Sequence, residues 1–468
     1  MGYLAGEVKR NTNWNVKVYN AEFSPRVEKL DYSYLTKTGF NNYLNNLNNL
    51  SGEIWNEIRT IILEWEPAVI GISAKSQNFT SACNIAKLAK KIDKNIIVIV
   101  GGPHPSMVGE DVLKCPDIDI GVKGEGEITI VELLNALEAK RGLEDISGIV
   151  YRKEKEIFDN KPRDFISDLD KLSFPYEIAH EALIDYEQYP KTAFSFIFAT
   201  RGCPYNCFFC GSRKIWSRKT RFRTVDNVVR EINNLQKLGL KSIQFDDDTF
   251  GIRKDYIIDL CNALIEHCPG IKWSCELHVK LVNDDTISLM KRAGCFLIRI
   301  GIESGNNEIL KSMKKNITIE EAYAACRIIK KYNIELLVFF IVGFPQETEE
   351  SLNDTKKAMK KVKCDQISYS IFTPYPGTIA FEYCKEKNLI DGDFDVSLYN
   401  HQSPANNFCS NISRERFRTL VSAIEKEVDR YNNLRRIKRI FSINTIWRIR
   451  QLGLKKSFEK GLRIFMNK

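Results

Sequence analysis

The sequence contains no apolar run near the ~18 residues that a membrane-spanning helix requires, and its longest runs, such as LLVFFIV, have the length of buried strands. The N-terminus, MGYLAGEVKRN, lacks the basic and then apolar pattern of a secretion signal. Without such a signal, the odd number of thirteen cysteines indicates a reducing compartment, where clustered cysteines bind metal or act in catalysis. We therefore expect a cytoplasmic protein without a transmembrane segment.

The net charge of +9 is concentrated at the C-terminal end of the chain. From Asn411 onward there are sixteen Lys and Arg residues against five acidic residues, so the rest of the chain is close to neutral. No nucleic-acid recognition motif accompanies the basic tail, and nucleic acid is not an expected partner. We predict that residues 396–468 form a basic helical region whose apolar stripe packs on the preceding domain. Contact with an anionic membrane or a partner protein is the alternative.

A length of 468 residues predicts two or three domains. Helix-like and strand-like segments alternate over residues 1–145, which predicts an α/β domain with a parallel sheet. Its expected strands are NVKVYNAEF, AVIGISA, NIIVIVGG and the start of DIDIGVKGEGE. The Asn-rich run NNYLNNLNNL is interpreted as a polar connector. Residues 146–190 are predicted to form a hairpin and an extended linker.

Six strand-and-helix units are predicted in residues 191–395, fewer than the eight of a closed barrel, so we expect a curved, partly open (β/α)6 barrel. Ligands of such a fold gather at the C-terminal ends of the strands. Unusual residues follow all six predicted strands: the cysteine loop, FDDDTF, Glu276 with His278, GIESG, GFPQET and PYPGT. Their shared position indicates one functional face.

Three cysteines of RGCPYNCFFC, Cys203, Cys207 and Cys210, follow the first predicted strand of this barrel. A structural zinc site uses four ligands, usually as two separated pairs, and the next cysteine, Cys261, lies fifty residues on. Cys261 itself is expected to pack in the core. Three thiolates can instead hold three corners of a four-iron cluster and leave the fourth iron open to a chelating molecule. The spacing therefore predicts a catalytic iron–sulfur cluster.

This motif resembles the CxxxCxxC signature of the radical S-adenosylmethionine (SAM) superfamily, whose fold is the six-unit partial barrel. The resemblance implies that SAM chelates the open iron and is cleaved by one-electron reduction to a 5′-deoxyadenosyl radical. It also implies SAM contacts at the matching positions. These are Phe209, Ile341 and Gly343 near the adenine, Asp247 and Asp248 at the methionine amino group, and Glu303 and Ser304 at the ribose. Members commonly carry Arg near the position of His278, which receives no role.

The first domain resembles a Rossmann-like cobalamin-binding domain. The resemblance rests on GISAK, VGGPHPS and GVKGEGE, and implies cobalamin contacts from Ser73, Gly101, Gly102, Gly124 and Glu125. His104 could face the corrin, but no histidine precedes it, so the lower cobalt ligand of methionine synthase has no counterpart before it. The first, central strand of the family also has no counterpart. We expect either a chain that continues upstream or a sheet without that strand.

Together the two resemblances imply a cobalamin-dependent radical SAM enzyme with a 4Fe-4S cluster, SAM and cobalamin as cofactors. A methyltransferase that acts on an unactivated carbon or phosphorus is the leading hypothesis. A radical cyclase similar to the anaerobic Mg-protoporphyrin ester cyclase is the first alternative, and a non-enzymatic cobalamin or iron–sulfur carrier is the second. A tRNA methylthiotransferase is disfavoured because the first domain lacks clustered cysteines. Expected partners are a small-molecule substrate and a reductase, flavodoxin or ferredoxin as electron donor.

Overall fold

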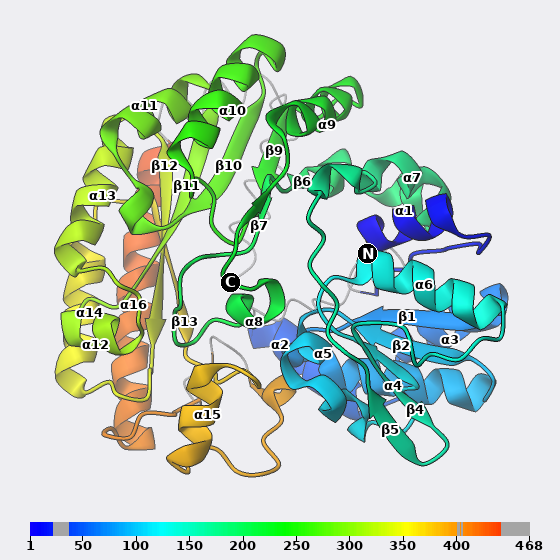
Figure 1. Ribbon diagram of the computed structural model, residues 1–468. Helices are drawn as coiled ribbons and strands as arrows, with labels where there is room; N and C mark the ends of the chain where they lie inside the picture. Colours follow the sequence, from blue (N-terminus) through cyan, green and yellow to red (C-terminus); the bar gives the residue numbers. More distant parts are fainter. Residues whose placement is uncertain (22–36, 400–402, 404–405, 441–468) are drawn as a thin grey trace.

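Two separate β-sheets organise the protein, one in each of two lobes that lie side by side (Figure 1). The computed structural model describes residues 1–21, 37–399, 403 and 406–440. The α/β class expected for both lobes is confirmed: the first sheet has five strands and the second has six. No described helix is both long enough and apolar enough to cross a membrane.

The first sheet has its strands in sequence order, β1-β2-β3-β4-β5. β1 to β3 pair in parallel, and β4 and β5 add an antiparallel hairpin. The strands are β1 (Val69–Ser73), β2 (Ile97–Gly101), β3 (Ile120–Val122), β4 (Ile149–Lys153) and β5 (Glu156–Asp159). The predicted hairpin therefore joins the first sheet. The helices of this lobe are α1 (Gly2–Asn11), α2 (Lys37–Asn48), α3 (Glu53–Trp65), α4 (Phe79–Ile92), α5 (Pro103–Val108) and α6 (Gly126–Glu138).

Two local predictions for this lobe are wrong. In the expected strand NVKVYNAEF, the described part forms only an isolated bridge between Val18 and Leu183, and residues 22 and 23 lie outside the described residues. The backbone of Val18 bonds to Ala182 and Ile184, so it follows the end of a helix rather than a strand. The Asn-rich run belongs largely to helix α2, because Phe40 and Leu47 fall on one helical face and are buried.

The linker between the lobes contains helix α7 (Pro175–Ala182) and is tied to the N-terminal helix. Glu7 of α1 accepts hydrogen bonds from the backbone and the hydroxyl of Ser173, at 2.8 and 2.6 Å. Arg10 donates to the carbonyl of Lys171 at 2.9 Å. Helix α1 also packs against α6, so the linker is held against the first lobe.

The second sheet is a parallel, open barrel with the strand order β13-β12-β11-β10-β9-β6, as predicted. Its strands are β6 (Phe196–Ile197), β9 (Ser242–Phe245), β10 (Lys272–Leu277), β11 (Cys295–Glu303), β12 (Glu335–Val342) and β13 (Gln366–Ile371). Along β12, half-buried interior side chains alternate with buried ones that face the helices. The helices are α9 (Val225–Lys237), α10 (Lys254–His267), α11 (Asp284–Arg292), α12 (Asn307–Ser312), α13 (Ile319–Lys331), α14 (Glu349–Lys361) and α15 (Ile379–Glu386).

The C-terminal helix α16 (Arg414–Ile440) covers the β13 edge of this barrel (Figure 1). Phe417, Val421 and Ile424 are buried in the barrel core, so the described part of the predicted basic helical region packs an apolar stripe on the barrel. The Asn432 side chain makes two hydrogen bonds of the kind that a neighbouring strand would make. It accepts from the backbone N–H of Ile367 and donates to the Ile367 carbonyl. The basic tail from residue 441 onward lies outside the described residues.

Candidate functional site

The cysteine loop lies between strand β7 (Thr200–Arg201) and helix α8 (Ser212–Trp216). β7 leaves the main sheet and pairs with β8 (Arg221–Phe222), so the chain turns away from the barrel just before Cys203. Gly202 makes this turn with φ of +101°, and a Cβ there would lie 2.6 Å from the Lys219 carbonyl oxygen. The loop therefore needs glycine at its first position.

Backbone hydrogen bonds hold the middle of the loop in place. The N–H of Cys210 donates to the Cys207 carbonyl at 3.1 Å, which forms a tight turn between the two cysteines. The N–H of Phe208 donates to Met313, and its carbonyl accepts from Ala380, so the loop is fixed to α12 and α15. The Phe208 ring is buried edge-on against Phe344. These contacts preorganise the loop before any ligand binds.

The three loop thiols fit the predicted cluster. All three are free and half-buried, whereas nine of the other ten cysteines are buried and Cys83 is in the first lobe. Burial raises the pKa of Cys207 to about 11, so ligation has to displace its proton. Within the described residues, no three His, Cys, Asp or Glu side chains converge closely enough for a single metal ion. A cluster does not require that convergence, because each thiolate binds a different iron.

A buried ion pair lies next to the cysteine loop. Lys315 Nζ is 2.7 Å from Glu303 Oε1, and both side chains are 9% exposed. Glu303 has a φ of +73°, which is unusual for a residue with a side chain. Gly301 makes room for the pair, since a Cβ there would meet both charged groups. The Lys315 charge acts to lower the pKa of Cys207 and Cys210, although burial outweighs it.

Asp248, Phe209 and Ile341 also lie around the loop. Asp248 is exposed and its carboxylate lies against the Gly202 backbone. Phe209 and Ile341 are half-buried and pack on the cluster of aromatic side chains that contains Phe208. With Glu303, these are four of the seven predicted SAM residues, and their location leaves those predictions open.

The other three predicted SAM residues, like Glu303, make contacts within the protein. Asp247 is 4% exposed, and its carboxylate accepts from the Ala199 N–H at 2.8 Å and the Thr200 hydroxyl at 2.6 Å. The Ser304 hydroxyl is buried against that of Thr355 at 3.2 Å. The remaining residue is the glycine of the GFP turn: a Cβ on Gly343 would lie 2.7 Å from the Phe417 ring. Asp247 thus braces the start of the cysteine loop.

His278, which received no role from the sequence, stacks on Tyr205 of the cysteine loop. The two ring centroids are 3.7 Å apart and the rings are inclined by 13°. Its Nδ1 accepts from the Lys280 N–H at 3.3 Å, which leaves Nε2 to donate to the Lys315 carbonyl at 3.3 Å. Burial lowers the pKa of His278 to about 3, so the ring is neutral. The neutral His278 ring therefore supports the cysteine loop through its stacking on Tyr205.

The carboxyl edge of the first sheet brings together most of the predicted cobalamin residues. Ser73 ends β1 and Gly101 ends β2, and the two are paired in register. Gly102 has a φ of +101°, and a Cβ there would be 3.0 Å from the Ala74 carbonyl and 3.3 Å from the Ser73 hydroxyl. The Ser106 hydroxyl donates to Gly102 and accepts from the N–H of Gly124. The edge is thus a surface of backbone and small side chains.

His104 and Glu125 are turned away from this edge. His104 is 7% exposed, and its ring packs against Phe79 with the centroids 4.0 Å apart and contacts the Ser76 hydroxyl at 3.1 Å. Burial lowers its pKa to about 4. The Glu125 side chain is 1% exposed, and its carboxylate is bound by Arg201 and Arg221 of the second lobe, at 2.8 and 2.7 Å.

The carboxyl edges of the two sheets face each other. The segments that follow β1, β2 and β3 each contact a segment at the carboxyl end of the barrel. Gln77 donates to the Tyr375 hydroxyl at 3.0 Å, and the Lys214 ammonium donates to the Met107 carbonyl at 2.6 Å. The third contact is the Glu125–Arg201 pair. Two sets of strand ends, one with three thiols and one with a glycine-rich slot, therefore meet at one junction.

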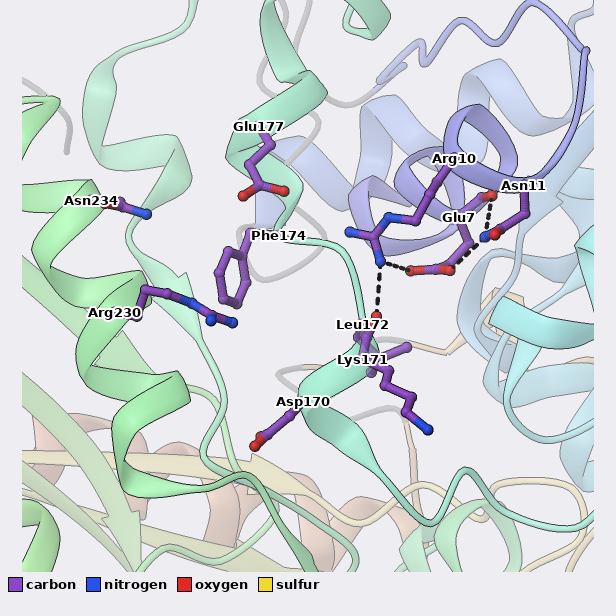
Figure 2. A pocket seen from close by; sticks show the side chains of 10 residues that line it. All are labelled: Glu7, Arg10, Asn11, Asp170, Lys171, Leu172, Phe174, Glu177, Arg230 and Asn234. Carbon is purple, nitrogen blue, oxygen red and sulfur yellow. Dashed lines mark hydrogen bonds and ion pairs between the residues drawn. The ribbon is translucent and has the colours of Figure 1, made fainter.

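A separate cavity of about 590 Å³ lies between α1, the linker and α9. Figure 2 shows that the side chains of Arg10, Arg230 and Glu177 come from these three elements and approach the same space. None of the predicted site residues lines this cavity. It is therefore distinct from the junction of the strand ends.

Sequence reasoning missed Lys315, Ser106 and Arg201. The run SMKKNI contains two adjacent lysines, and nothing in it indicates which one is buried. A buried lysine needs a carboxylate partner, and Glu303 is twelve residues away. Of these three residues, Arg201 had the clearest sequence signal of a role at the site, because it lies two residues before Cys203.

Comparison with known proteins agrees with this geometry. The family described as the radical SAM superfamily matches residues 197–375, and the B12 binding domain matches residues 33–134. An uncharacterized methyltransferase of Pyrococcus horikoshii is 34% identical over 339 residues, covering 72% of this chain and 73% of that protein. The chain is therefore a radical SAM enzyme. It belongs to the branch of this superfamily that also carries a B12-binding domain, and the cofactors of that branch are a 4Fe-4S cluster, SAM and cobalamin.

Two further comparisons extend the result. The anaerobic magnesium-protoporphyrin IX monomethyl ester cyclase of Rubrivivax gelatinosus is 28% identical, covering 74% of this chain and 63% of the cyclase. The radical SAM methyltransferase TsrM of Kitasatospora setae, solved with cobalamin and a 4Fe-4S cluster, superposes with a TM-score of 0.62 at 16% identity. The superposition covers 79% of this chain and 81% of TsrM, which shows a shared two-lobe fold.

Proposed function

We propose that this protein transfers a methyl group to an unactivated carbon or phosphorus of a small molecule. The observation that carries the proposal is the meeting of the two carboxyl edges, through Gln77–Tyr375, Lys214–Met107 and Glu125–Arg201. When bound, the three cofactors supply an electron, a 5′-deoxyadenosyl radical and a transferable methyl group. Such chemistry needs both cofactor sites to open on one substrate, because a radical acts only on atoms in contact with it.

The residues around the cysteine loop have suitable chemistry for holding SAM. Cys203, Cys207 and Cys210 hold the cluster. Asp248 is an exposed residue whose carboxylate lies beside the loop, and it suits the amino group of SAM. Lys315 is a buried ammonium between Glu303 and the cysteines, and it suits the SAM carboxylate. Phe209 and Ile341 provide the apolar wall for the adenine.

The first lobe offers a surface for cobalamin at Ser73, Gly101, Gly102 and Gly124. Gly124 has open space where a Cβ would stand, and Gly101 has only one ordinary contact, at 3.7 Å. A ligand can thus approach the backbone closely at this edge. His104 is buried against Phe79, so it does not act as a cobalt ligand in this proposal. An external reductase, flavodoxin or ferredoxin supplies electrons, and the reaction takes place in the cytoplasm.

Ring formation is the second candidate, because three of the relatives found are anaerobic magnesium-protoporphyrin IX monomethyl ester cyclases at 28% identity. A cyclase and a methyltransferase use the same cofactors but differ in the fate of the SAM methyl group. A methyltransferase places that group in the product, whereas a cyclase does not.

The test is an anaerobic assay with the cluster-loaded protein, hydroxocobalamin, a reductant and SAM whose methyl group carries deuterium. Small-molecule extracts of the host are the substrate source, and products are read by mass spectrometry. A product that gains the labelled methyl group supports the proposal. Formation of 5′-deoxyadenosine together with an unlabelled, cyclised product would replace methyl transfer by cyclisation.

A further inference from the structure

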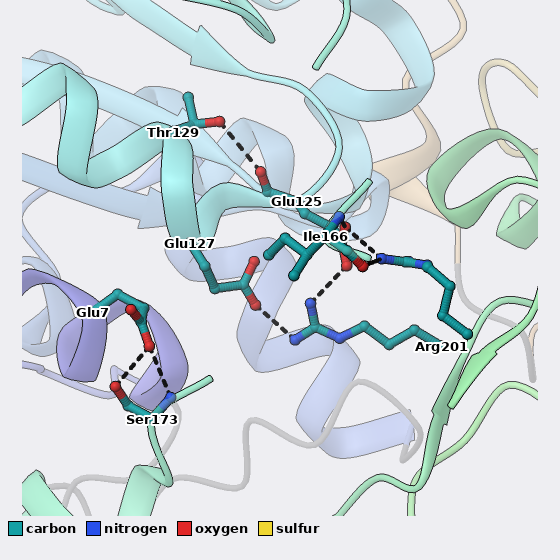
Figure 3. A network of polar contacts seen from close by, with 8 residues as sticks. Glu7, Glu125, Glu127, Thr129, Ile166, Ser173 and Arg201 are labelled. Carbon is teal, nitrogen blue, oxygen red and sulfur yellow. Dashed lines mark hydrogen bonds and ion pairs between the residues drawn. The ribbon is translucent and has the colours of Figure 1, made fainter. Parts of the chain in front are cut away.

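A buried cluster of charged side chains joins the two lobes beside the cysteine loop (Figure 3). Glu125 directly precedes α6 in the first lobe, and Glu127 lies in the first turn of that helix. Arg201 and Arg221 belong to β7 and β8 of the second lobe, where they are paired in register. The cluster therefore joins the end of β3 to the strand that leads into Cys203.

In the described part of the chain, both oxygens of the Glu125 carboxylate accept hydrogen bonds from groups that help fix the junction. Oε1 accepts from Arg201 Nη1 at 2.8 Å. Oε2 accepts from Arg221 Nη1 and from the backbone N–H of Ile166, both at 2.7 Å. Glu127 accepts from Arg201 Nη2 at 2.6 Å. Two cations and two anions thus balance in a site where none of the four side chains is more than 9% exposed.

Arg201 also contacts the far end of the cysteine loop. Its guanidinium lies 5.4 Å from the ring centre of Trp216, the last residue of α8, and 4.7 Å from that of Phe198. Arg201 is two residues before Cys203, and Trp216 is six residues after Cys210. Arg201 therefore stands at one end of the cysteine loop and contacts the other end, while its charge is paired with carboxylates of the first lobe.

Arg221 makes the buried cluster of charged side chains depend on Glu125. Its Nε and Nη2 are buried, and neither has a hydrogen-bond partner in the described part of the chain. Its remaining polar contacts are those of Nη1, with Glu125 and with the Ile166 carbonyl at 2.7 Å. Removing the charge of Glu125 would leave a buried cation without an anionic partner, which is strongly unfavourable.

We propose that Glu125, Glu127, Arg201 and Arg221 form a positioning clamp. This clamp fixes the cobalamin-binding lobe against the cysteine loop and sets the separation of the two cofactors. This inference rests on the proposed function only for the identity of the cofactors. Glu125 acts through the arginines and does not touch cobalamin. The clamp holds the loop ends and the β3 edge as one rigid unit, so the geometry of the junction does not depend on substrate.

A matched control is available two residues away. Arg223 and Glu231 form an ion pair with the same charges at 2.5 Å, and both side chains are 2% exposed. Both belong to the barrel lobe, and Arg223 also bonds to Asn227 and to the Phe198 carbonyl. Glu231→Gln therefore removes the anion of a buried pair without touching the junction. Glu125→Gln also removes the anion of a buried pair, with a similar change in side-chain shape, but does so at the junction itself.

Hydrogen exchange of the purified protein tests the clamp without any cofactor. In Glu125→Gln we expect exchange at the Ile166 amide, and in the segments 123–127 and 201–222, to be about 100-fold faster, because local opening becomes easier. Helices α11 and α13 should keep their wild-type rates. Glu231→Gln should accelerate exchange around α9 and leave the Ile166 amide protected. Wild-type protection of Ile166 and of both segments in Glu125→Gln would overturn the proposal.

A second measurement separates positioning from simple stability. Pulsed electron paramagnetic resonance of the loaded protein reports the dipolar coupling between the reduced cluster and cob(II)alamin. We expect one narrow coupling in the wild type and in Glu231→Gln, and a broadened one in Glu125→Gln with unchanged iron and cobalamin content. An identical narrow coupling in Glu125→Gln would overturn the clamp. Failure of the wild type to bind cobalamin would instead refute the proposed function, and the exchange experiment would still decide the clamp.

If Glu125→Gln does not accumulate as folded protein, Glu127→Gln takes its place in both experiments. This change weakens the bond to Arg201 Nη2 and the attraction to the N-terminal ammonium, and it leaves Glu125 between the two arginines. Its expected effects are in the same direction and smaller. Unchanged exchange and unchanged coupling in Glu127→Gln would contradict the four-residue clamp.

Discussion

The two carboxyl edges that meet at the junction present different chemical groups. The barrel edge presents ligating and charged side chains, among them Cys203, Asp248 and Lys315. The edge of the first sheet presents glycine backbone and small hydroxyls, as at Gly102 and Ser106. An iron cluster is held by bonds to specific atoms, whereas a large ligand can be held by close fit to a smooth surface. The first kind of site depends on residue identity, and the second depends on backbone conformation.

The largest expected effect is on the barrel edge. Cys203→Ala, Cys207→Ala and Cys210→Ala should each abolish the four-iron cluster and SAM cleavage, because each thiolate holds a different iron. Iron and sulfide content and 5′-deoxyadenosine formation are the measurements. Cys261→Ala is the control, since Cys261 is buried in α10, and it should leave both unchanged. A full cluster in any of the three loop variants would contradict the assignment.

Loss of the C-terminal cover should destabilise the barrel and spare the first lobe. Phe417 is 0% exposed and packs against Gly343, which directly follows β12, so Phe417→Ala should cost about 3–5 kcal/mol of barrel stability. Peptide-resolved hydrogen exchange should show the loss in β12 and β13 but not in β1 to β3. A uniform loss over both sheets would show that the lobes unfold as one unit.

At the carboxyl edge of the first sheet, even the methyl group of an alanine should reduce cobalamin binding. Gly102→Ala places a Cβ at a φ of +101° and 3.0 Å from the Ala74 carbonyl, at an expected cost of about 3 kcal/mol. We expect reduced cobalamin binding with normal cluster content. Gly71→Ala, where a Cβ meets nothing within 4 Å, is the matched control on β1. Equal cobalamin binding by Gly102→Ala and the wild type would show that this turn is not part of the cobalamin surface.

The smallest effect concerns acid stability of the first lobe. The folded-state pKa of His104 is lowered by burial to about 4, below its ordinary value of 6.5. The neutral ring therefore stabilises the fold above pH 6.5, and this contribution is lost as the pH falls toward 4. The first lobe should lose about 2 kcal/mol between about pH 8 and pH 5, measured by urea unfolding. His104→Gln should flatten that dependence, and an unchanged slope would contradict it.

The difference between the edges also explains what could be predicted from sequence. The barrel strands were predictable because β11 and β12 alternate in a regular pattern, and the cysteine loop was predictable because its function needs side chains of one type. The helical Asn-rich run was missed, since its polar residues obscured the burial of Phe40 and Leu47. Glu125 was interpreted as a cobalamin residue, because one sequence does not show that Arg201, 76 positions away, binds its carboxylate. Contacts between distant segments are what the sequence alone does not contain.

In the proposed function, the two cofactor sites face each other across the junction. The most direct test requires no substrate: the cluster-loaded protein is supplied with cobalamin, reduced to cob(I)alamin, and then with SAM, and methylcobalamin and S-adenosylhomocysteine are measured. Both products should form in equal amounts in the wild type, and both should be lost in Cys207→Ala, which cannot hold SAM at the loop. If the wild type binds both cofactors but forms neither product, the two sites do not face each other.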